Sequence, residues 1–432
     1  MTGKAGRKEA GEAFSSCFFF AAEAANIWTV TADIHPDDII IREGASDMKM
    51  KRTKKCLAIA AAVVMGITLC ACGSGNKGTG ATESKLELKE TEKGNKVNED
   101  FSLNVNTNRA SDYAKKELVL PVKGIGRGIS TDVKAKKKYK IVVMTRNSTN
   151  PYMIGMWAGG AQAGKDMGLE VQTLAPSNQD NIDDQLTIME SLIDQNVDGF
   201  VIHPSDSKGI QPMIDAANEK GIPVVAIGTA PDTGAFMRTG VDYYETGYLV
   251  TKELCEAAGG KGKAIILEGP AGVQNMEERK AGIKDAIAEY PDMEIAASQT
   301  ANCKRDEAMR VMENLLAKED IADGLTIVSC CNDEMAIGAI QALKAKHMKN
   351  VFVGGADASK DASQAVKDGD LYVTYNTDPY GSTYLAVTYL VQYLNDKTLP
   401  EEYFIPFPSE RHNPLITKDN VQEYIDQYRW FE

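Results

Sequence analysis

From Tyr139 onward, short apolar runs rich in β-branched residues alternate with longer stretches in which apolar residues recur at helical spacing. The apolar runs are continuous, as in strands that are buried on both faces of a parallel sheet. Strands are predicted over 140–145, 171–174, 199–203 and 223–227, and helices over 153–167, 182–195 and 210–218. After Asp242 the alternation starts again, with strands predicted over 263–267, 294–298, 325–328 and 351–353 and helices over 276–288, 306–316 and 334–344.

The two halves of this region share a short pattern. The sequence Val-Asp-Gly-Phe-Val-Ile at 197–202 is similar to Ala-Asp-Gly-Leu-Thr-Ile at 322–327. In each half, the glycine is expected to end a helix and to turn the chain into a buried strand. The pattern therefore predicts an α/β fold with two doubly wound, parallel-sheet lobes. Because open α/β sheets bind ligands beyond the carboxyl ends of their strands, two facing lobes would enclose a ligand cleft.

Near the N-terminus, a basic segment at 48–55 is followed by a mostly apolar stretch at 57–69. This order is typical of an export signal. The ending Leu-Cys-Ala-Cys at 69–72 resembles a bacterial lipobox, and the resemblance implies that Cys72 is lipidated and becomes the mature N-terminus. A buried core helix is the alternative, but the basic flank and the polar sequence that follows favour export. No apolar run in the sequence approaches the ~20 residues that span a bilayer.

The segments on either side of this signal carry little pattern. Because the signal begins near Met48, we expect residues 1–47 to be an upstream extension that the native protein lacks. Residues 73–137 are rich in Gly, Ser, Thr, Asn, Lys and Glu, which bury too little apolar surface to fold, so a flexible tether is predicted. Within it, 114–122 is a candidate for a small docked element. The glycines at 124, 126 and 128 lack the strand–helix context of a phosphate loop and are interpreted as linker.

Composition and charge exclude several classes of function. The 432 residues include 48 Lys and Arg against 61 Asp and Glu, and this net charge of −13 argues against nucleic-acid binding. The chain has four His, and no two of them stand at metal-ligand spacing, so we expect neither a metal site nor a cofactor. In an exported protein, cysteines of the folded region could form a disulfide or remain free thiols. The sequence leaves this open for Cys255, Cys303, Cys330 and Cys331.

Several ordered segments between Tyr139 and Tyr424 resemble the type I periplasmic binding proteins, in their ribose- and galactose-binding branch. The most specific match is Asn-Asp-Glu-Met-Ala-Ile-Gly-Ala at 332–339. The other matching segments are Asn-Pro-Tyr at 150–152, 195–204, 221–225, 269–272 with the later Arg279 and Gly282, 354–357 and the segment around Pro379.

The resemblance implies a ligand site and a set of lobe boundaries. By position in the family's motifs, the residues implied to contact a sugar are Arg146, Asn150, Tyr152, Arg279, Asn332, Asp357 and Thr377, with Asn376 as a neighbouring alternative to Thr377. The N-terminal lobe is expected to comprise 138–241 and 378–400, the C-terminal lobe 242–377 and 401–421, and the C-terminal tail 422–432. A hinge is expected to join the two lobes.

The family pattern is broken at three places. Gly228-Thr229 stands where the family has an Asp-Arg pair, Cys303 replaces a ring-facing Phe, and Met153 replaces a second aromatic residue. The cleft is therefore expected to keep its architecture while its ligand is not fixed as ribose.

Structural roles compete with ligand contact at most of these positions. Asp357 and Asn332 could cap the helices that follow them. Arg279 could pair with Glu277 or other acids on a solvated face, and Tyr152 could belong to the core. An unpaired buried charge is costly, which favours ligand contact for Arg146. His203, at a strand end, is interpreted as a polar group satisfied within the protein.

The resemblance implies a lipid-anchored, monomeric solute-binding protein of the cell envelope that delivers a sugar or polyol to an ABC-type permease and catalyses no reaction. A sensory protein that presents its ligand to a membrane receptor is a second possibility, because it would use the same cleft. An exported hydrolase is disfavoured, since the sequence has no Gly-x-Ser-x-Gly elbow. A transcription regulator of this fold would need a helix-turn-helix where the chain has an export signal and a polar segment.

Overall fold

The computed structural model of the protein describes residues 42–43, 46–47, 89–90, 96–97, 120–400, 402–406 and 414–428. Before residue 120 it contains two short antiparallel pairs, β1 (Arg42–Glu43) with β2 (Ser46–Asp47) and β3 (Lys89–Glu90) with β4 (Lys96–Val97). The predictions for Cys72, for the export signal over 48–72 and for most of 1–47 and 73–119 lie outside the described residues.

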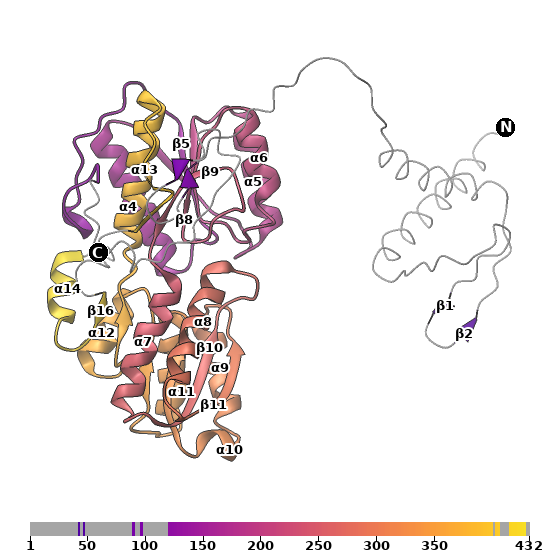
Figure 1. Cartoon of the computed structure of the whole chain (residues 1–432), viewed down its shortest axis with the longest axis vertical. Coiled ribbons are helices and arrows are strands. Elements are labelled where there is room, and N and C mark those ends of the chain that lie inside the picture. The colour runs from indigo at the N-terminus through magenta and orange to yellow at the C-terminus, as the bar shows by residue number, and fades with distance from the viewer. Residues whose placement is uncertain are drawn as a thin grey trace, which may run out of the picture. The chain divides into compact units, whose positions relative to one another are not determined.

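The first lobe is built on a six-stranded parallel sheet in the order β15-β9-β8-β7-β5-β6. Strands β5, β8 and β9 of this sheet are labelled in Figure 1. Ile141 and Val143 pack into a different apolar cluster from Val142 and Met144, as expected for a strand that is buried on both faces. The strands are β5 (Ile141–Met144), β6 (Val171–Leu174), β7 (Gly199–Ile202), β8 (Val224–Ile227), β9 (Ala235–Gly240) and β15 (Phe404–Pro406).

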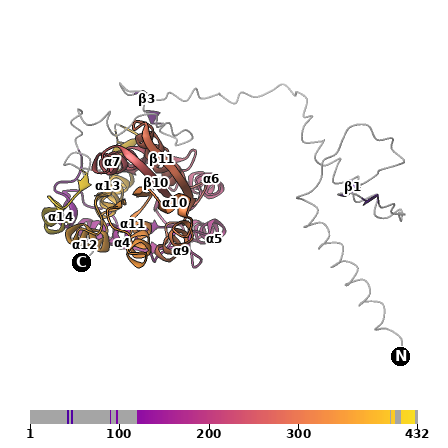
Figure 2. The ribbon, with the colours of Figure 1, turned by 90° about the horizontal axis from the view of Figure 1, so that it is seen from below.

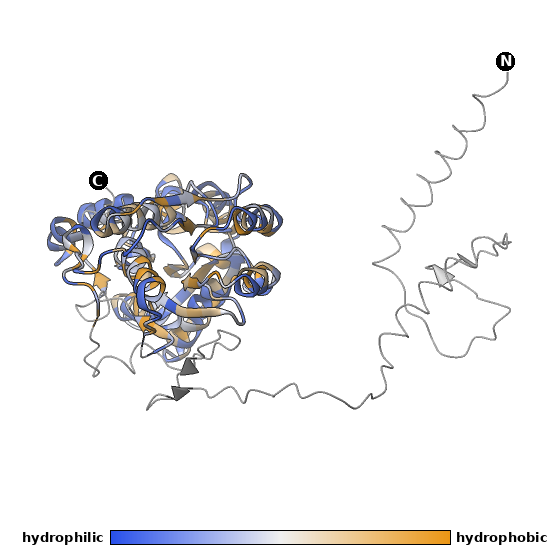
Figure 3. Ribbon diagram, turned by 90° about the horizontal axis from the view of Figure 1, so that it is seen from above, coloured by the Kyte–Doolittle hydropathy of each residue, from blue (hydrophilic) through white to orange (hydrophobic). Residues whose placement is uncertain are grey.

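Two pairs of helices cover this sheet. Helices α4 (Pro151–Met167) and α13 (Pro379–Asp396) lie against each other, and α5 (Ile182–Asp194) lies against α6 (Gln211–Glu219). The contact between α4 and α13 is so close that a Cβ at Gly159 would lie 2.1 Å from the carbonyl oxygen of Tyr380, so only glycine fits there. The helices carry both hydrophilic and hydrophobic residues, drawn in blue and orange in Figure 3.

The second lobe repeats this plan with four parallel strands in the order β11-β10-β12-β13. Figure 2 shows β10 and β11 of this sheet side by side. Helix α7 packs on α8, and α9 packs on α11. The two sheets share their core strand order, which confirms the prediction of two doubly wound lobes. The elements are α7 (Tyr243–Ala257), β10 (Lys261–Glu268), α8 (Gln274–Ala288), β11 (Asp292–Thr300), α9 (Arg305–Leu315), α10 (Glu319–Ala322), β12 (Leu325–Cys330), α11 (Asp333–Ala345), β13 (Phe352–Gly354) and α12 (Lys360–Asp368).

The chain crosses between the lobes after β9 and again after β14 (Thr374–Tyr375), near the two boundaries predicted at 241 and 377. The third boundary differs from the prediction. Strand β15 pairs with β9 and so belongs to the first lobe, whereas β16 (Leu415–Ile416) pairs with β14. The assignment of all of 401–421 to the C-terminal lobe was therefore wrong for 404–406, because an edge of the first sheet accepts this strand.

The predictions of a tether over 73–137 and a tail over 422–432 also need correction where these segments join the lobes. Residues 120–137 form a segment that lies on the body: Val122 and Ile129 are buried there around the 3₁₀ turn η1 (Gly126–Gly128). The predicted tail begins instead with the helix α14 (Val421–Tyr428), which contacts η1 and α12.

We call residues 120–137 the strap. Its few apolar residues suffice to order it because the body provides the rest of the apolar surface.

Among the helices in the described ranges, none combines the length and the apolar character that a membrane crossing requires.

Candidate functional site

The two lobes face each other with the carboxyl ends of their strands, and loops from both sheets line a narrow cavity of about 10 Å³ between them. Arg146 follows β5 and His203 follows β7, while Cys303, Asn332 and Asp357 follow β11, β12 and β13. The residues that line the cavity are Arg146, Asn150, Tyr152, Met153, His203, Asn275, Met276, Arg279, Cys303, Asn332 and Asp357. The site thus lies where ligands bind in open α/β sheets.

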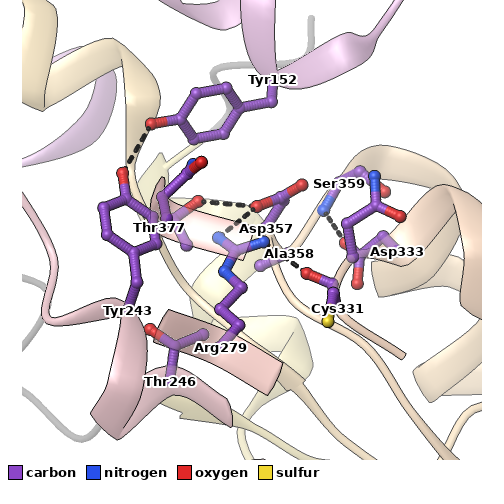
Figure 4. A network of polar contacts seen from close by, with 12 residues as sticks. Tyr152, Tyr243, Thr246, Arg279, Cys331, Asp333, Asp357, Ala358, Ser359 and Thr377 are labelled. Carbon is purple, nitrogen blue, oxygen red and sulfur yellow. Dashed lines mark hydrogen bonds and ion pairs between the residues drawn. The ribbon is translucent and has the colours of Figure 1, made fainter. Parts of the chain in front are cut away.

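A buried ion pair forms the centre of the wall that the second lobe contributes (Figure 4). Arg279, on α8, donates through Nη2 to Oδ1 of Asp357 at 3.0 Å and through Nη1 to the carbonyl oxygen of Cys331 at 2.5 Å. Burial alone would lower the pKa of Arg279, but Asp357 and Tyr243 raise it, so this side chain is always cationic. Burial raises the pKa of Asp357, and Arg279 opposes that rise.

The backbone around Asp357 adopts an unusual conformation. Asp357 has a φ of 123° and Ala358 a φ of 49°, both in the region that side-chain-bearing residues rarely occupy. Each such residue costs about 1–3 kcal/mol, and such residues cluster at ligand sites. The turn holds the Asp357 carboxyl over Arg279, and Thr377 donates a further hydrogen bond to Asp357 Oδ1 at 3.4 Å.

The first lobe contributes polar atoms that the protein itself does not satisfy. Within the described residues, Nη1 of Arg146 and both ring nitrogens of His203 are buried and have no hydrogen-bond partner. Arg146 Nε lies 3.4 Å from Oδ1 of Asp180, which balances the arginine's charge. Burial and the charges of Arg146 and Arg279 hold the pKa of His203 well below its usual range, so the imidazole is neutral. Such groups are costly unless another molecule completes their hydrogen bonds.

Direct side-chain contacts join the two lobes near the cavity. Thr229 donates to Asn275 Oδ1 at 3.1 Å, and the hydroxyls of Tyr152 and Tyr243 lie 3.3 Å apart. Arg238 Nη2 lies 3.5 Å from a carboxylate oxygen of Glu278. Thr229 is one of the positions at which the sequence departs from the family's Asp-Arg pair, and here it links one lobe directly to the other.

Six of the eight predicted site residues line the cavity: Arg146, Asn150, Tyr152, Arg279, Asn332 and Asp357. Thr377 and Asn376 do not. Thr377 reaches the cavity only through Asp357, and the Asn376 side chain accepts a hydrogen bond from the Asp378 backbone in the hinge. The hydrogen bonds to Asp357 and from the Asp378 backbone take up these two side chains. Ligand contact by these eight residues remains a prediction.

The competing structural roles are partly realised. Asn332 caps α11 by accepting from the Met335 N–H, and Asn150 caps α4 in the same way, so both residues combine a cap with a place at the cavity. Asp357 caps no helix, since Ser359 caps α12. Arg279 pairs with Asp357 and not with Glu277, which pairs with Lys280.

Some residues that line the cavity were not predicted from the sequence. His203 was interpreted as internally satisfied, yet both of its nitrogens lack partners, and Asn275 and Met276 were not singled out at all. Their places after the carboxyl ends of β7 and β10 were the available signal. Cys303 and Met153, noted only as departures from the family, also line the cavity.

The four cysteines in the lobes are free thiols. Cys255, Cys303, Cys330 and Cys331 are all buried and unbridged. Burial raises the pKa of Cys303 to about 12, so the thiol at the cavity is protonated and weakly nucleophilic. In the described part of the chain, no group of three or more His, Cys, Asp or Glu residues is placed to hold a metal ion.

Comparison with known proteins agrees with this geometry. The chain is similar to the xylitol-binding protein of Mycolicibacterium smegmatis, with 32% identity over 255 residues, which are 58% of this chain and 70% of that protein. It is 30% identical over 245 residues to the ribose import binding protein of Bacillus subtilis, covering 56% of this chain and 78% of the relative.

The chain is also similar in structure to a solved solute-binding protein. The ABC transporter solute-binding protein of Actinobacillus succinogenes, determined with bound D-allose, superposes with a TM-score of 0.61 at 31% identity, covering 66% of this chain and 100% of that one. Residues 141–398 match the family described as periplasmic binding protein domain. That match extends over more than half of the 432 residues, and the chain therefore belongs to the periplasmic binding protein family.

Proposed function

We propose that this protein is an extracytoplasmic solute-binding protein that closes its two lobes on a neutral sugar or polyol and delivers it to an ABC-type permease. The observation that carries the proposal is the cavity between the lobes with unpartnered buried polar atoms of Arg146 and His203 on its wall. A sugar or polyol offers hydroxyls that both donate and accept. Such a ligand can therefore satisfy a guanidinium N–H and a neutral imidazole in the same site.

The charges around the cavity favour an uncharged ligand. Arg146 lies beside Asp180, and Arg279 is paired with Asp357, so each cation already has an anion. A phosphate or carboxylate ligand would have to compete with these aspartates. A neutral hydroxylated molecule can bind without disturbing either pair.

The mixture of polar and apolar groups at the cavity suits a small hydroxylated ligand. At about 10 Å³ the cavity as it stands has room for about one water molecule, so the lobes must move apart to admit a sugar or polyol. Eight lining side chains carry hydrogen-bonding groups, and the three others are Met153, Met276 and Cys303, which can pack against C–H surfaces. At about 0.5–1.5 kcal/mol per hydrogen bond, roughly five to eight contacts plus apolar packing reach micromolar affinity.

The test is a thermal-shift and calorimetric screen of the full chain against D-ribose, D-allose, xylitol and myo-inositol, with glucose 6-phosphate as the anionic control. A ligand that binds the folded state raises the melting temperature. We expect at least one neutral compound to do so, to be recovered chemically unchanged, and to lose its shift in the Asp357→Asn variant. A shift with the phosphate alone, or conversion of a sugar to product, would contradict the proposal.

We further propose that the protein is a monomer held at the membrane by lipid on Cys72. The support is the basic and apolar pattern over 48–69 that ends in Leu-Cys-Ala-Cys. Cells that express the chain and are fed an alkyne fatty acid should label the protein, and Cys72→Ser should abolish the label while Cys70→Ser retains it. Labelling that survives Cys72→Ser would refute the anchor. Size-exclusion chromatography with light scattering tests the monomer.

A further inference from the structure

The strained turn at Asp357 and Ala358 is held in place by a residue that does not line the cavity. Asp333, the first residue of α11, is buried behind this turn. Its Oδ2 accepts a hydrogen bond from the Ser359 N–H at 2.7 Å, and its Oδ1 accepts one from the Thr374 hydroxyl at 2.6 Å (Figure 4 shows the bond to Ser359).

Thr374 extends this support to the centre of the turn. Its hydroxyl oxygen accepts a hydrogen bond from the Ala358 N–H at 3.2 Å, while its proton goes to Asp333. The backbone N–H of Asp333 donates to the Ala356 carbonyl oxygen at 2.8 Å. Asp333 therefore contacts the chain before the turn and after it, and reaches Ala358 through Thr374.

Space for Asp333 is provided by glycine. A Cβ at Gly355 would lie 2.6 Å from Asp333 Oδ1 and 3.2 Å from its Cα, so any other residue would push the carboxylate away from the turn. Gly355 thus allows the strand end and the helix start to approach closely enough for both carboxylate oxygens to be used.

We propose that Asp333 is a positioning residue for the ligand site: it fixes the 357–359 turn in the conformation that keeps the Asp357 carboxylate on Arg279 and at the cavity. This inference rests on the proposed solute-binding function for its effect on affinity, although its geometric part can be tested without a ligand. The role favours the ionised carboxylate, because both of its oxygens then accept strong, charge-assisted hydrogen bonds from Ser359 and Thr374, whereas protonation turns one oxygen into a donor and weakens the bond it accepts.

The charges around Asp333 make this preference sensitive to pH. Burial, and then the charge of Asp357 in the turn, raise the pKa of Asp333 to about 7. Cys330, on β12, also lies close enough to interact with Asp333, but burial holds the pKa of its thiol well above the usual range and it stays neutral. Arg279, from α8, is bonded to Asp357 and stabilises that carboxylate.

The first test is structural and needs no ligand. Crystal structures at pH 8 of Asp333→Asn and Thr374→Val should show Asp357 rotated out of its present backbone conformation, with its Oδ1 no longer within hydrogen-bond distance of Arg279 Nη2. The matched control is Glu334→Gln, the same chemical change one residue on, where the side chain pairs with Arg305 and does not line the cavity. An unchanged turn in both test variants would overturn the proposal, and Thr374→Val decides if Asp333→Asn does not fold.

The second test is calorimetric titration with D-ribose, D-allose, xylitol and myo-inositol at pH 6, 7 and 8. For each compound that binds the native chain, we expect about tenfold weaker binding by Asp333→Asn and Thr374→Val at pH 8 and binding within twofold of native by Glu334→Gln. The native protein should lose affinity from pH 8 to pH 6, and Asp333→Asn should lose clearly less over the same range, the remaining change coming from Asp357, whose pKa burial also raises.

The hinge provides the control for this pH profile. Burial raises the pKa of Asp378 to about 7 as well, so Asp378→Asn must keep the native pH response. A flat profile in Asp378→Asn together with a native profile in Asp333→Asn would assign the response to the hinge and refute the inference. If none of the four compounds binds the native chain, the proposed sugar-binding function fails, while the crystal structures still decide the role of Asp333.

Discussion

Breaking the buried pair between Arg279 and Asp357 should cost stability that replacing both partners restores. The Arg279 side chain is only 2% exposed and the Asp357 side chain 8%, so neither charge can turn to water when its partner is lost. We choose Asp357→Asn because asparagine has a similar shape and tolerates the positive φ at this position. The partner substitution is Arg279→Met, which keeps a long, flexible side chain.

Removing one partner of a buried ion pair typically costs about 3–5 kcal/mol. The lower value applies to Asp357→Asn, since the amide oxygen can still accept from Arg279 and the bond from Arg279 to the Cys331 carbonyl remains. With an unfolding entropy of about 2.1 cal/mol/K per residue over roughly 300 residues, 3 kcal/mol corresponds to a fall of about 5 °C in the melting temperature. The double variant should lose less than Asp357→Asn alone, because no buried charge is left without a partner.

The assay is equilibrium urea denaturation of the native chain, both single variants and the double variant, followed by circular dichroism and by fluorescence. Arg310→Met is the matched control, because Arg310 pairs with Asp306 on an exposed helix face, and its midpoint should not move. Coupling between the two buried sites should reach several kcal/mol. Additive effects to within about 0.5 kcal/mol would show that the two side chains act independently and would refute the reasoning.

Three further predictions concern the hinge, the strap and the contact between the lobes. Because the pKa of Asp378 is raised to about 7, the free energy of unfolding should fall as the pH rises from about 4 to 7, and Asp378→Asn should be more stable than the native chain at pH 8 but similar to it at pH 4, as urea titrations can show. Gly126→Ala should release the strap and α14, because the added Cβ would lie 2.5 Å from Tyr428 Cα and because Gly126 itself has a φ of 52°. Amide hydrogen exchange should therefore rise over 120–137 and 421–428. Unchanged exchange would contradict the packing of the strap against α14. Thr229→Val removes the hydrogen bond to Asn275 and should weaken binding of any sugar in the panel about two- to tenfold by calorimetry, whereas equal affinity would mean that this contact does not stabilise the closed form.

The two lobes could be predicted from the sequence because their strands are continuous apolar runs between amphipathic helices. Strand β9 was not predicted, and its sequence Ala-Phe-Met-Arg-Thr-Gly explains why. Arg238, in its second half, would normally argue against a buried strand. In the structure it is only 7% exposed and finds its partner, Glu278, in the other lobe. No local pattern contains that information.

Part of the site could also be predicted from the sequence, because the fold itself brings residues at strand ends together. Arg146, Asn150, Asn332 and Asp357 follow strand ends, where the fold places ligand-binding residues, so topology alone brings them to one cavity. His203 also follows a strand, but whether its nitrogens find partners depends on side chains from other elements. The strap was assigned to the tether because its apolar residues are too sparse to indicate a core of their own.

The turn at Asp357 shows most clearly where sequence reasoning stops. The sequence Gly-Gly-Ala-Asp-Ala-Ser at 354–359 has glycines that could adopt positive φ values, yet it is Asp357 and Ala358 that do so. A strained backbone persists only where surrounding contacts over-determine it. Those contacts come from Asp333 and Thr374, which are separated from the turn by more than ten residues in the sequence. The carboxylate at the cavity is therefore set by a second, buried carboxylate, and a substitution there should alter recognition without touching the cavity wall.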